Sequence, residues 1–160
     1  MTTTAVLSAH NEMLTQRWLD DEVYGERFRG TIRVSPEDIE GALKEIKRWS
    51  AHPRMVQIGV PLQSREVYGK PQFMPLWEEA SRRGLPVAVH TEPGNGIGYP
   101  PTPSGHPRTY PQYAGFMGLN YLYHLMSLIT EGVFEALPDF KIVWADGGAE
   151  MLTPASSSNC

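Results

Sequence analysis

The chain has 160 residues, of which 41% are hydrophobic and 20% are charged, and its formal net charge is −4. This length and composition suit one globular domain. The single cysteine, Cys160, excludes an intrachain disulfide, and the acidic balance without a basic cluster argues against nucleic acid as a partner. No apolar stretch is long enough to span a membrane and no signal peptide is recognisable, so we expect a cytoplasmic protein that does not contact membranes.

The first part of the chain alternates between helical and strand patterns. We expect a helix over about 5–21 and a strand over 28–34. Ser35 and Pro36 predict the start of a second helix, because serine favours the N-cap and proline the first helical position. A strand over 54–60 follows, and then a helix that is opened by a proline and ended by a glycine, over about 71–84.

The second part continues this alternation. A strand is expected over 85–90, a loop over 91–110, a helical stretch over 113–137 with a break near Gly132, and a last strand over 141–145. Short apolar strands that alternate with helices predict a parallel sheet built from right-handed βαβ units.

Two polar side chains, His90 and Asp146, come directly after apolar strands. The ends of parallel strands lie at one edge of a sheet, so both side chains are expected to project there. Imidazole is a common metal ligand and an acid or base near neutral pH, and a carboxylate can bind metal or move a proton. The simpler alternatives stay open: His90 can bond a neighbouring loop, and Asp146 can cap the turn at the two glycines after it.

Three further residues are candidates for the same site. A histidine within a helix, such as His124, is more often buried and hydrogen-bonded, but its place could set it below the strand-end edge as a second catalytic group. The loop over 91–110 is rich in proline and glycine, and its length predicts a segment that covers substrate. Arg108 and Tyr110 could hold a substrate carboxylate there, since arginine pairs with carboxylates through two hydrogen bonds; simple solvation is the alternative.

Several blocks of sequence together carry a family resemblance. They are, in order, 29–34 (RGTIRV), 45–49 (EIKRW), 56–61 (VQIGVP), 75–80 (PLWEEA), 84–90 (GLPVAVH), 131–134 (EGVF), 137–143 (LPDFKIV) and 146–148 (DGG). With these blocks the chain resembles the amidohydrolase-related superfamily, in its decarboxylase-like branch. The resemblance implies an α/β fold, a partial (β/α)8 TIM barrel with about four parallel strands and intervening helices over residues 1–152. Residues 153–160 are small and polar and are expected to form a disordered tail.

The resemblance also implies a chemistry. His90 stands where the family has a ligand of a divalent metal, zinc or manganese, and Asp146 stands where it has a histidine or an acid followed by two glycines. The implied activity is that of a metal-dependent hydrolase or non-oxidative decarboxylase whose small-molecule substrate is an organic or aromatic acid.

The sequence departs from the family pattern in two places. It has no His-X-His pair of the kind found on the family's first strand, and no later strand that ends in aspartate. We therefore expect the middle of a barrel, with an incomplete metal site, weak metal binding and little activity. Open sheet edges would favour pairing with another copy, so a homo-oligomer is possible. A non-catalytic α/β binding module or a gene remnant is the alternative, and a non-sequential strand order would favour a doubly wound sheet.

Overall fold

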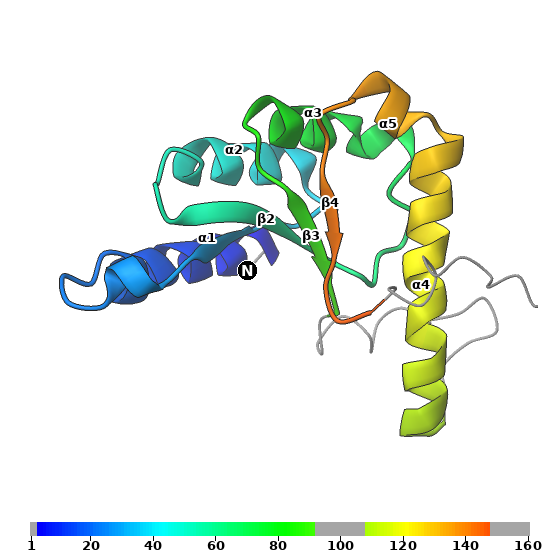
Figure 1. Ribbon diagram of the computed structural model, residues 1–160, viewed down its shortest axis with the longest axis horizontal. Coiled ribbons are helices and arrows are strands. Elements are labelled where there is room, and N and C mark those ends of the chain that lie inside the picture. The colour runs from blue at the N-terminus through cyan, green and yellow to red at the C-terminus, as the bar shows by residue number, and fades with distance from the viewer. Residues whose placement is uncertain (1–2, 92–107, 148–160) are drawn as a thin grey trace, which may run out of the picture.

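Four parallel strands form one sheet in the computed structural model, which describes residues 3–91 and 108–147, with residues 113–117 described by their backbone alone (Figure 1). The strands are β1 (Gly30–Arg33), β2 (Met55–Pro61), β3 (Val87–His90) and β4 (Ile142–Trp144). Their spatial order follows the sequence, β1-β2-β3-β4, and each neighbouring pair is parallel. This order confirms the predicted parallel sheet and disagrees with the doubly wound alternative, in which the order reverses.

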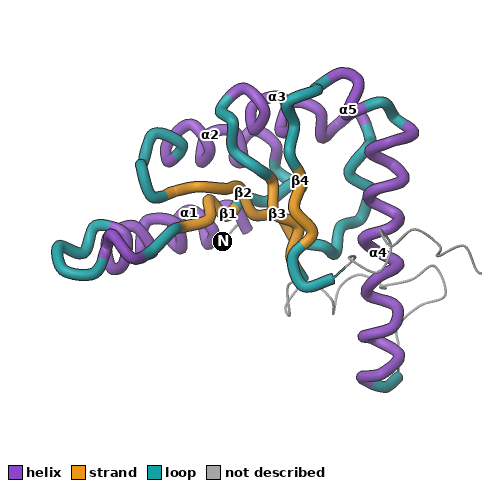
Figure 2. The backbone as a smooth tube through the Cα atoms, viewed as in Figure 1, coloured by secondary structure: helices purple, strands orange, loops and turns teal. Residues whose placement is uncertain are grey.

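Helices connect and flank the strands (Figure 2). They are α1 (Thr3–Leu14), which continues in a π-helical turn over Thr15–Leu19, α2 (Ile39–Trp49), α3 (Met74–Arg82), α4 (Tyr110–Thr130) and α5 (Val133–Ala136), with short 3-10 turns at Gly25–Arg27 and Pro71–Phe73. In the part of the chain that the structure describes, no helix combines the length and apolar character needed to cross a bilayer.

The start of α2 differs from the sequence prediction. Its N-cap is Asp38, whose carboxylate accepts a hydrogen bond from the Gly41 N–H at 3.0 Å. Ser35 and Pro36 lie in the turn before this cap. Aspartate caps helices as well as serine does, so two capping signals three residues apart compete and the later one defines the helix. The predicted helix breaks at Gly84 and Gly132 are confirmed, because both residues have a left-handed backbone with φ of 65° and 72°.

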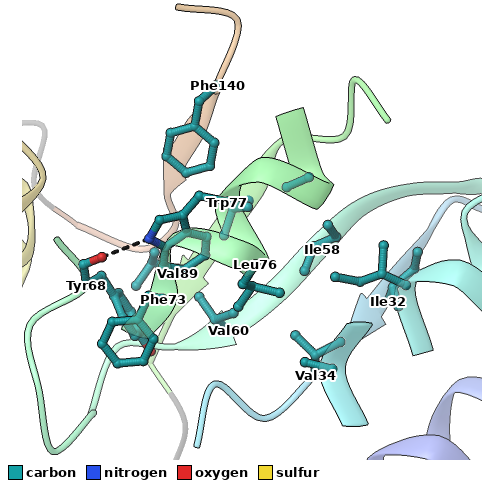
Figure 3. Close-up of a cluster of buried hydrophobic side chains, with 14 of the residues drawn as sticks. Ile32, Val34, Ile58, Val60, Tyr68, Phe73, Leu76, Trp77, Val89 and Phe140 are labelled. Carbon is teal, nitrogen blue, oxygen red and sulfur yellow. Dashed lines mark hydrogen bonds between the residues drawn. The ribbon is translucent and has the colours of Figure 1, made fainter. Parts of the chain in front are cut away.

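One face of the sheet forms the hydrophobic core against α2 and α3 (Figure 3). Alternate residues of β1, β2 and β3, among them Ile32, Ile58 and Val89, are completely buried there. Trp77 of α3 is also completely buried, and its indole N–H donates a 2.8 Å hydrogen bond to the carbonyl oxygen of Tyr68. Because successive side chains of a strand point to opposite faces, this packing turns residues such as Arg33 and His90 toward the other face.

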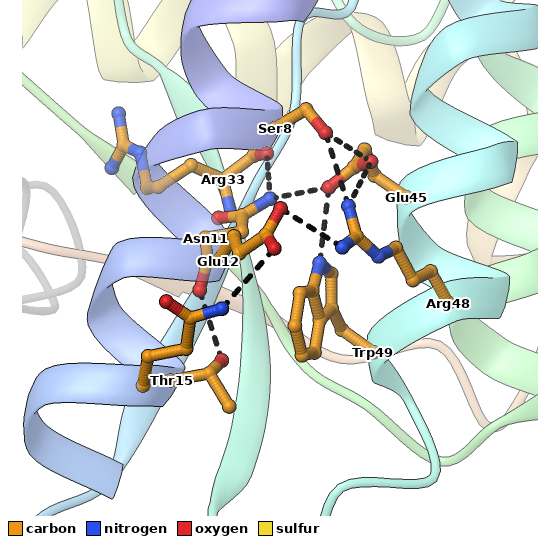
Figure 4. Close-up of polar contacts among 9 residues, drawn as sticks. Ser8, Asn11, Glu12, Thr15, Arg33, Glu45, Arg48 and Trp49 are labelled. Atoms are coloured by element: carbon orange, nitrogen blue, oxygen red, sulfur yellow. Dashed lines mark hydrogen bonds and ion pairs between the residues drawn. The ribbon is translucent and has the colours of Figure 1, made fainter.

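Helix α1 protects the edge of the sheet at β1. Asn11 is completely buried, and its side-chain amide accepts a hydrogen bond from the Arg33 N–H at 2.8 Å and donates one to the Arg33 carbonyl at 2.9 Å. The amide thus imitates a neighbouring strand. It also donates a 2.9 Å bond to Glu45 of α2 (Figure 4). The expectation of an open edge is therefore wrong at Arg33, where side-chain hydrogen bonds replace those of a missing strand.

Candidate functional site

His90 is the last residue of β3 and is held at the strand-end edge by its backbone. It pairs with Pro61 of β2, and its carbonyl oxygen accepts a 2.7 Å hydrogen bond from the Leu62 N–H. Its side chain is 45% exposed, and Nδ1 makes a short contact with the carbonyl oxygen of Thr91. A ring nitrogen that donates to a backbone carbonyl fixes the orientation of the imidazole and leaves Nε2 to act on a partner.

Asp146 supplies that partner. The N–H of Ala145 donates a 3.0 Å hydrogen bond to the carbonyl of Val89, which keeps the end of β4 beside the end of β3. Asp146 then adopts a left-handed backbone with φ of 70°, a conformation that aspartate tolerates better than most residues. Its Oδ2 lies 2.7 Å from Nε2 of His90. The prediction that both side chains project at one edge of the sheet is confirmed.

Tyr121 of α4 positions the turn that carries Asp146. Its hydroxyl donates a hydrogen bond to the carbonyl oxygen of Ala145, and its ring packs edge-on against Trp144 at 5.6 Å. A Cβ at Gly147 would lie 2.9 Å from Cε2 of the same ring, so only glycine fits there without a shift. The sequence analysis did not single out Tyr121; the glycine after Asp146 was the available signal that something packs against this turn.

The contact between His90 and Asp146 requires a proton or another cation between its two atoms. If Nδ1 of His90 donates to the Thr91 carbonyl, a neutral ring presents a lone pair from Nε2 to the Asp146 carboxylate, which is repulsive. The 2.7 Å distance therefore implies a proton on one of the two atoms, Nε2 or Oδ2. A neutral imidazole and a carboxylate are ordinary ligands of zinc and manganese, so both side chains could hold an ion in place of this proton once Nε2 and Oδ2 move apart. The pair therefore has the chemistry of two metal ligands.

The rest of a ligand set is not found in the described residues. Within residues 3–91 and 108–147, no group of three or more His, Cys, Asp or Glu side chains lies close enough to hold an ion. A catalytic zinc ordinarily has three protein ligands. The structure thus brings together two of the expected groups, and these two are also exposed to solvent.

His124 lies in the middle of α4. Its Nδ1 accepts a 3.2 Å hydrogen bond from the Tyr68 N–H, so Nε2 carries the proton and donates to the Leu62 carbonyl at 2.8 Å. The ring stacks on Tyr68 at 4.2 Å. Burial lowers the pKa of His124 to about 4, because a charged imidazolium is poorly solvated there. Both nitrogens are thus engaged with backbone groups, and that of Leu62 is itself bonded to His90. The catalytic role expected for His124 stays a prediction.

The structure does not bring Arg108 or Tyr110 into contact with the pair. Both are exposed at the start of α4, which begins beyond the strand-end edge of the sheet (Figure 1). Thr109 caps this helix, and the Arg108 N–H donates to the side chain of Gln112 at 2.9 Å. Most of the expected covering loop, residues 92–107, lies outside the described residues, as does the expected tail over 153–160. Their roles remain predictions.

A cavity opens beside His90 on the sheet face away from the core. It has a volume of about 160 Å³ and is lined by Thr31, Arg33, Gln57, Gly59, Ala88, His90 and Ala145. These residues come from β1, β2 and β3 and from the residue after β4, and they form the face that a closed barrel turns inward. Arg33 was not identified as a site residue from the sequence. It is the last residue of β1, and the same kind of position, at the end of a strand, made His90 a candidate.

Comparison with known proteins supports the family expected from the sequence. Residues 3–151 match the amidohydrolase family. An amidohydrolase from Mycobacterium avium subsp. paratuberculosis has a similar structure, with a TM-score of 0.71, 22% identity, and coverage of 90% of this chain and 38% of that one. No protein of curated function matches this sequence.

Two decarboxylases are also similar in structure. 5-Carboxyvanillate decarboxylase from Sphingomonas paucimobilis has a TM-score of 0.67 and 21% identity, over 88% of this chain and 41% of that one. Dihydroxybenzoic acid decarboxylase from Polaromonas sp. JS666, with bound manganese and the inhibitor 2-nitroresorcinol, has a TM-score of 0.63 and 20% identity, over 88% and 43%.

The chain belongs to the amidohydrolase family, because the match covers nearly all of it. At identities near 20%, the solved structures establish the fold, which is a partial (β/α)8 barrel. The chain spans about two fifths of the length of these structures.

Proposed function

We propose that this chain carries part of the active site of a metal-dependent hydrolase or non-oxidative decarboxylase that acts on a small organic or aromatic acid. The observation that carries the proposal is the 2.7 Å contact between Nε2 of His90 and Oδ2 of Asp146 at the strand-end edge of the sheet. In barrel enzymes of this kind, catalytic groups stand at the carboxyl ends of the strands. The manganese in one structurally similar decarboxylase supports a divalent metal.

His90 and Asp146 would hold the ion, which supplies Lewis-acid polarisation of a substrate oxygen when it is bound. Asp146 is 60% exposed, and the carboxylate oxygen that does not face His90 can pass a proton to the substrate. In decarboxylation, the bond to the carboxyl carbon breaks, carbon dioxide leaves, and the ring carbon takes up one proton. We propose that Asp146 delivers it. His124 would act by holding the Leu62 segment, which in turn bonds the backbone of His90.

A second candidate is a non-catalytic binding module. The observation that favours it is the lack of a third ligand near His90 and Asp146 among the described residues. Such a module would use the same cavity to hold a small acid without converting it. Weak metal binding is expected under both candidates, so turnover separates them.

The test is release of carbon dioxide from a panel of hydroxylated aromatic acids, in the presence of manganese or zinc. We expect slow, metal-dependent turnover that is lost in His90→Ala and in Asp146→Asn. The matched control is His10→Ala, which removes an exposed imidazole from α1. Turnover that persists in His90→Ala would contradict the proposal, and binding of the acids without any turnover would favour the module.

A further inference from the structure

Arg33 has a fixed backbone at the strand-end edge, on the same sheet face as His90. Both its N–H and its carbonyl are bonded to the buried amide of Asn11, at 2.8 and 2.9 Å. Its side chain extends away from the polar contacts that surround Asn11 (Figure 4). A long side chain whose base is held in this way loses less freedom when it binds a ligand.

Gly59 of β2 determines where the Arg33 side chain lies. The two residues are register partners, and a Cβ at Gly59 would lie 3.0 Å from Nη1 and 3.1 Å from Cδ of Arg33. The guanidinium group therefore crosses β2 over the bare backbone of Gly59. Ala88, the register partner of Gly59 on β3, continues this floor of small residues toward the strand that ends in His90. Because Gly59 has no side chain and that of Ala88 is small, these two residues leave space for the Arg33 side chain.

The cavity that results has one positive end and one end at His90. Among the described residues, the ionisable side chains that line it are Arg33 and His90, and none is acidic. A neighbouring cavity of about 260 Å³, which Arg33 also borders, is lined by Glu37. Burial lowers the pKa of Arg33 from its ordinary value, yet a guanidinium keeps its charge in proteins. A partly desolvated positive charge attracts a carboxylate more strongly than an exposed one does.

The dimensions suit a ring with one carboxylate. Adjacent strands lie roughly 5 Å apart, so the guanidinium over β2 is about one strand spacing from β3. A cavity of about 150 Å³ is known to accommodate a benzene ring, and the volume here is about 160 Å³. One aromatic acid can therefore place its carboxylate at Arg33 while its ring reaches toward His90.

We propose that Arg33 is a specificity-determining residue that binds the carboxylate of the substrate through its guanidinium group. The inference rests on the proposed function for its premise that the substrate is a small organic acid. It assigns to Arg33 the role that the sequence analysis had considered for Arg108 and Tyr110, and it sets the orientation of the acid relative to His90 and Asp146.

The test compares two probes that differ only in a carboxylate, 2,6-dihydroxybenzoate and resorcinol. Their binding to the full 160-residue chain is measured by isothermal titration calorimetry after removal of metal with a chelator. We expect the acid to bind at least about tenfold more tightly than resorcinol, as a charge-assisted pair provides. Arg33→Met should weaken acid binding by about tenfold or more and leave resorcinol unchanged. Arg33→Lys, which keeps the charge without the paired donors, should lie between them.

The matched control is Arg27→Met, which removes an exposed arginine from the 3-10 turn before β1. Thermal unfolding of each variant shows whether it is folded, and Arg33→Lys carries the comparison if Arg33→Met is not. Equal binding of the two probes, no binding of either, or acid binding unchanged in Arg33→Lys and Arg33→Met would overturn the inference. An acid preference that survives in His90→Ala while metal-dependent turnover is lost supports both proposals. If the Arg33 variants lose acid binding but His90→Ala keeps its turnover, only the proposed function is overturned.

Discussion

Replacing Asn11 with alanine tests whether the sheet edge depends on a side chain that imitates a strand. The substitution removes three hydrogen bonds of 2.8–2.9 Å, two to the backbone of Arg33 and one to Glu45. Each contributes about 1 kcal/mol, and leaving the edge groups and the carboxylate short of partners adds about 1–2 kcal/mol. We therefore expect Asn11→Ala to lower the free energy of unfolding by about 4–5 kcal/mol, a large part of the roughly 5–15 kcal/mol that stabilises a typical domain.

The assay is equilibrium unfolding in urea, followed by circular dichroism at constant protein concentration. Gln16→Ala is the matched control, because it removes an exposed amide from the π-helical turn after α1 that donates a 3.2 Å hydrogen bond to Glu12. The control should stay within about 0.5 kcal/mol of the unsubstituted chain. A loss in Asn11→Ala no larger than that of the control would refute the reasoning that Asn11 completes the β1 edge.

Three further substitutions test the elements around the site. The pKa of His124 is lowered from 6.5 to about 4 in the folded chain, so the unfolded chain binds the extra proton first as the pH falls. The free energy of unfolding should therefore fall by about 3 kcal/mol between pH 7 and 4 because of this group. Urea titrations should show that it depends less on pH in His124→Gln than in the unsubstituted chain; the same pH dependence in both would contradict the lowered pKa of His124. Tyr121→Phe removes the hydroxyl bond to Ala145 and should cost about 1 kcal/mol in the same titrations; no loss would show that the bond does not hold the turn. Gly59→Ala places a Cβ 2.6 Å from Thr31 Cγ2 and 3.0 Å from Arg33 Nη1, so calorimetry should show a weaker preference for 2,6-dihydroxybenzoate over resorcinol; an unchanged preference would contradict the position assigned to the guanidinium.

The local rules that governed the sequence analysis explain why much of the fold was predictable. The apolar run 85–89 is short, contains β-branched residues and lies between a glycine and a loop, which favours a buried strand, and glycines at positions 84 and 132 have the left-handed backbone that ends helices. Because parallel strands share one edge, His90 and Asp146 could be placed together from their position after two strands. The start of α2 was predicted wrongly because Ser35 and Asp38 are both good caps and the sequence does not rank them.

Contacts between distant segments were not predictable in the same way. Asn11 and Arg33 are far apart in the sequence, and no periodicity indicates that an amide in α1 replaces a strand at the β1 edge. The place of the Arg33 side chain depends on the missing side chain of Gly59 in the next strand, which becomes meaningful only when the register is known. His124 was ambiguous for the same reason, since its partners Tyr68 and Leu62 come from a loop that only the folded structure brings to α4.

The measurement that tests the central claim most directly is a manganese titration of the purified chain, in which electron paramagnetic resonance reports the free ion. We predict weak, saturable binding of one ion through His90 and Asp146, lost in His90→Ala and kept in His10→Ala. Binding that is the same in His90→Ala would contradict the assignment of the metal to this pair. Tight stoichiometric binding that disappears in His90→Ala would show that the site is complete and would contradict the expectation of a partial ligand set.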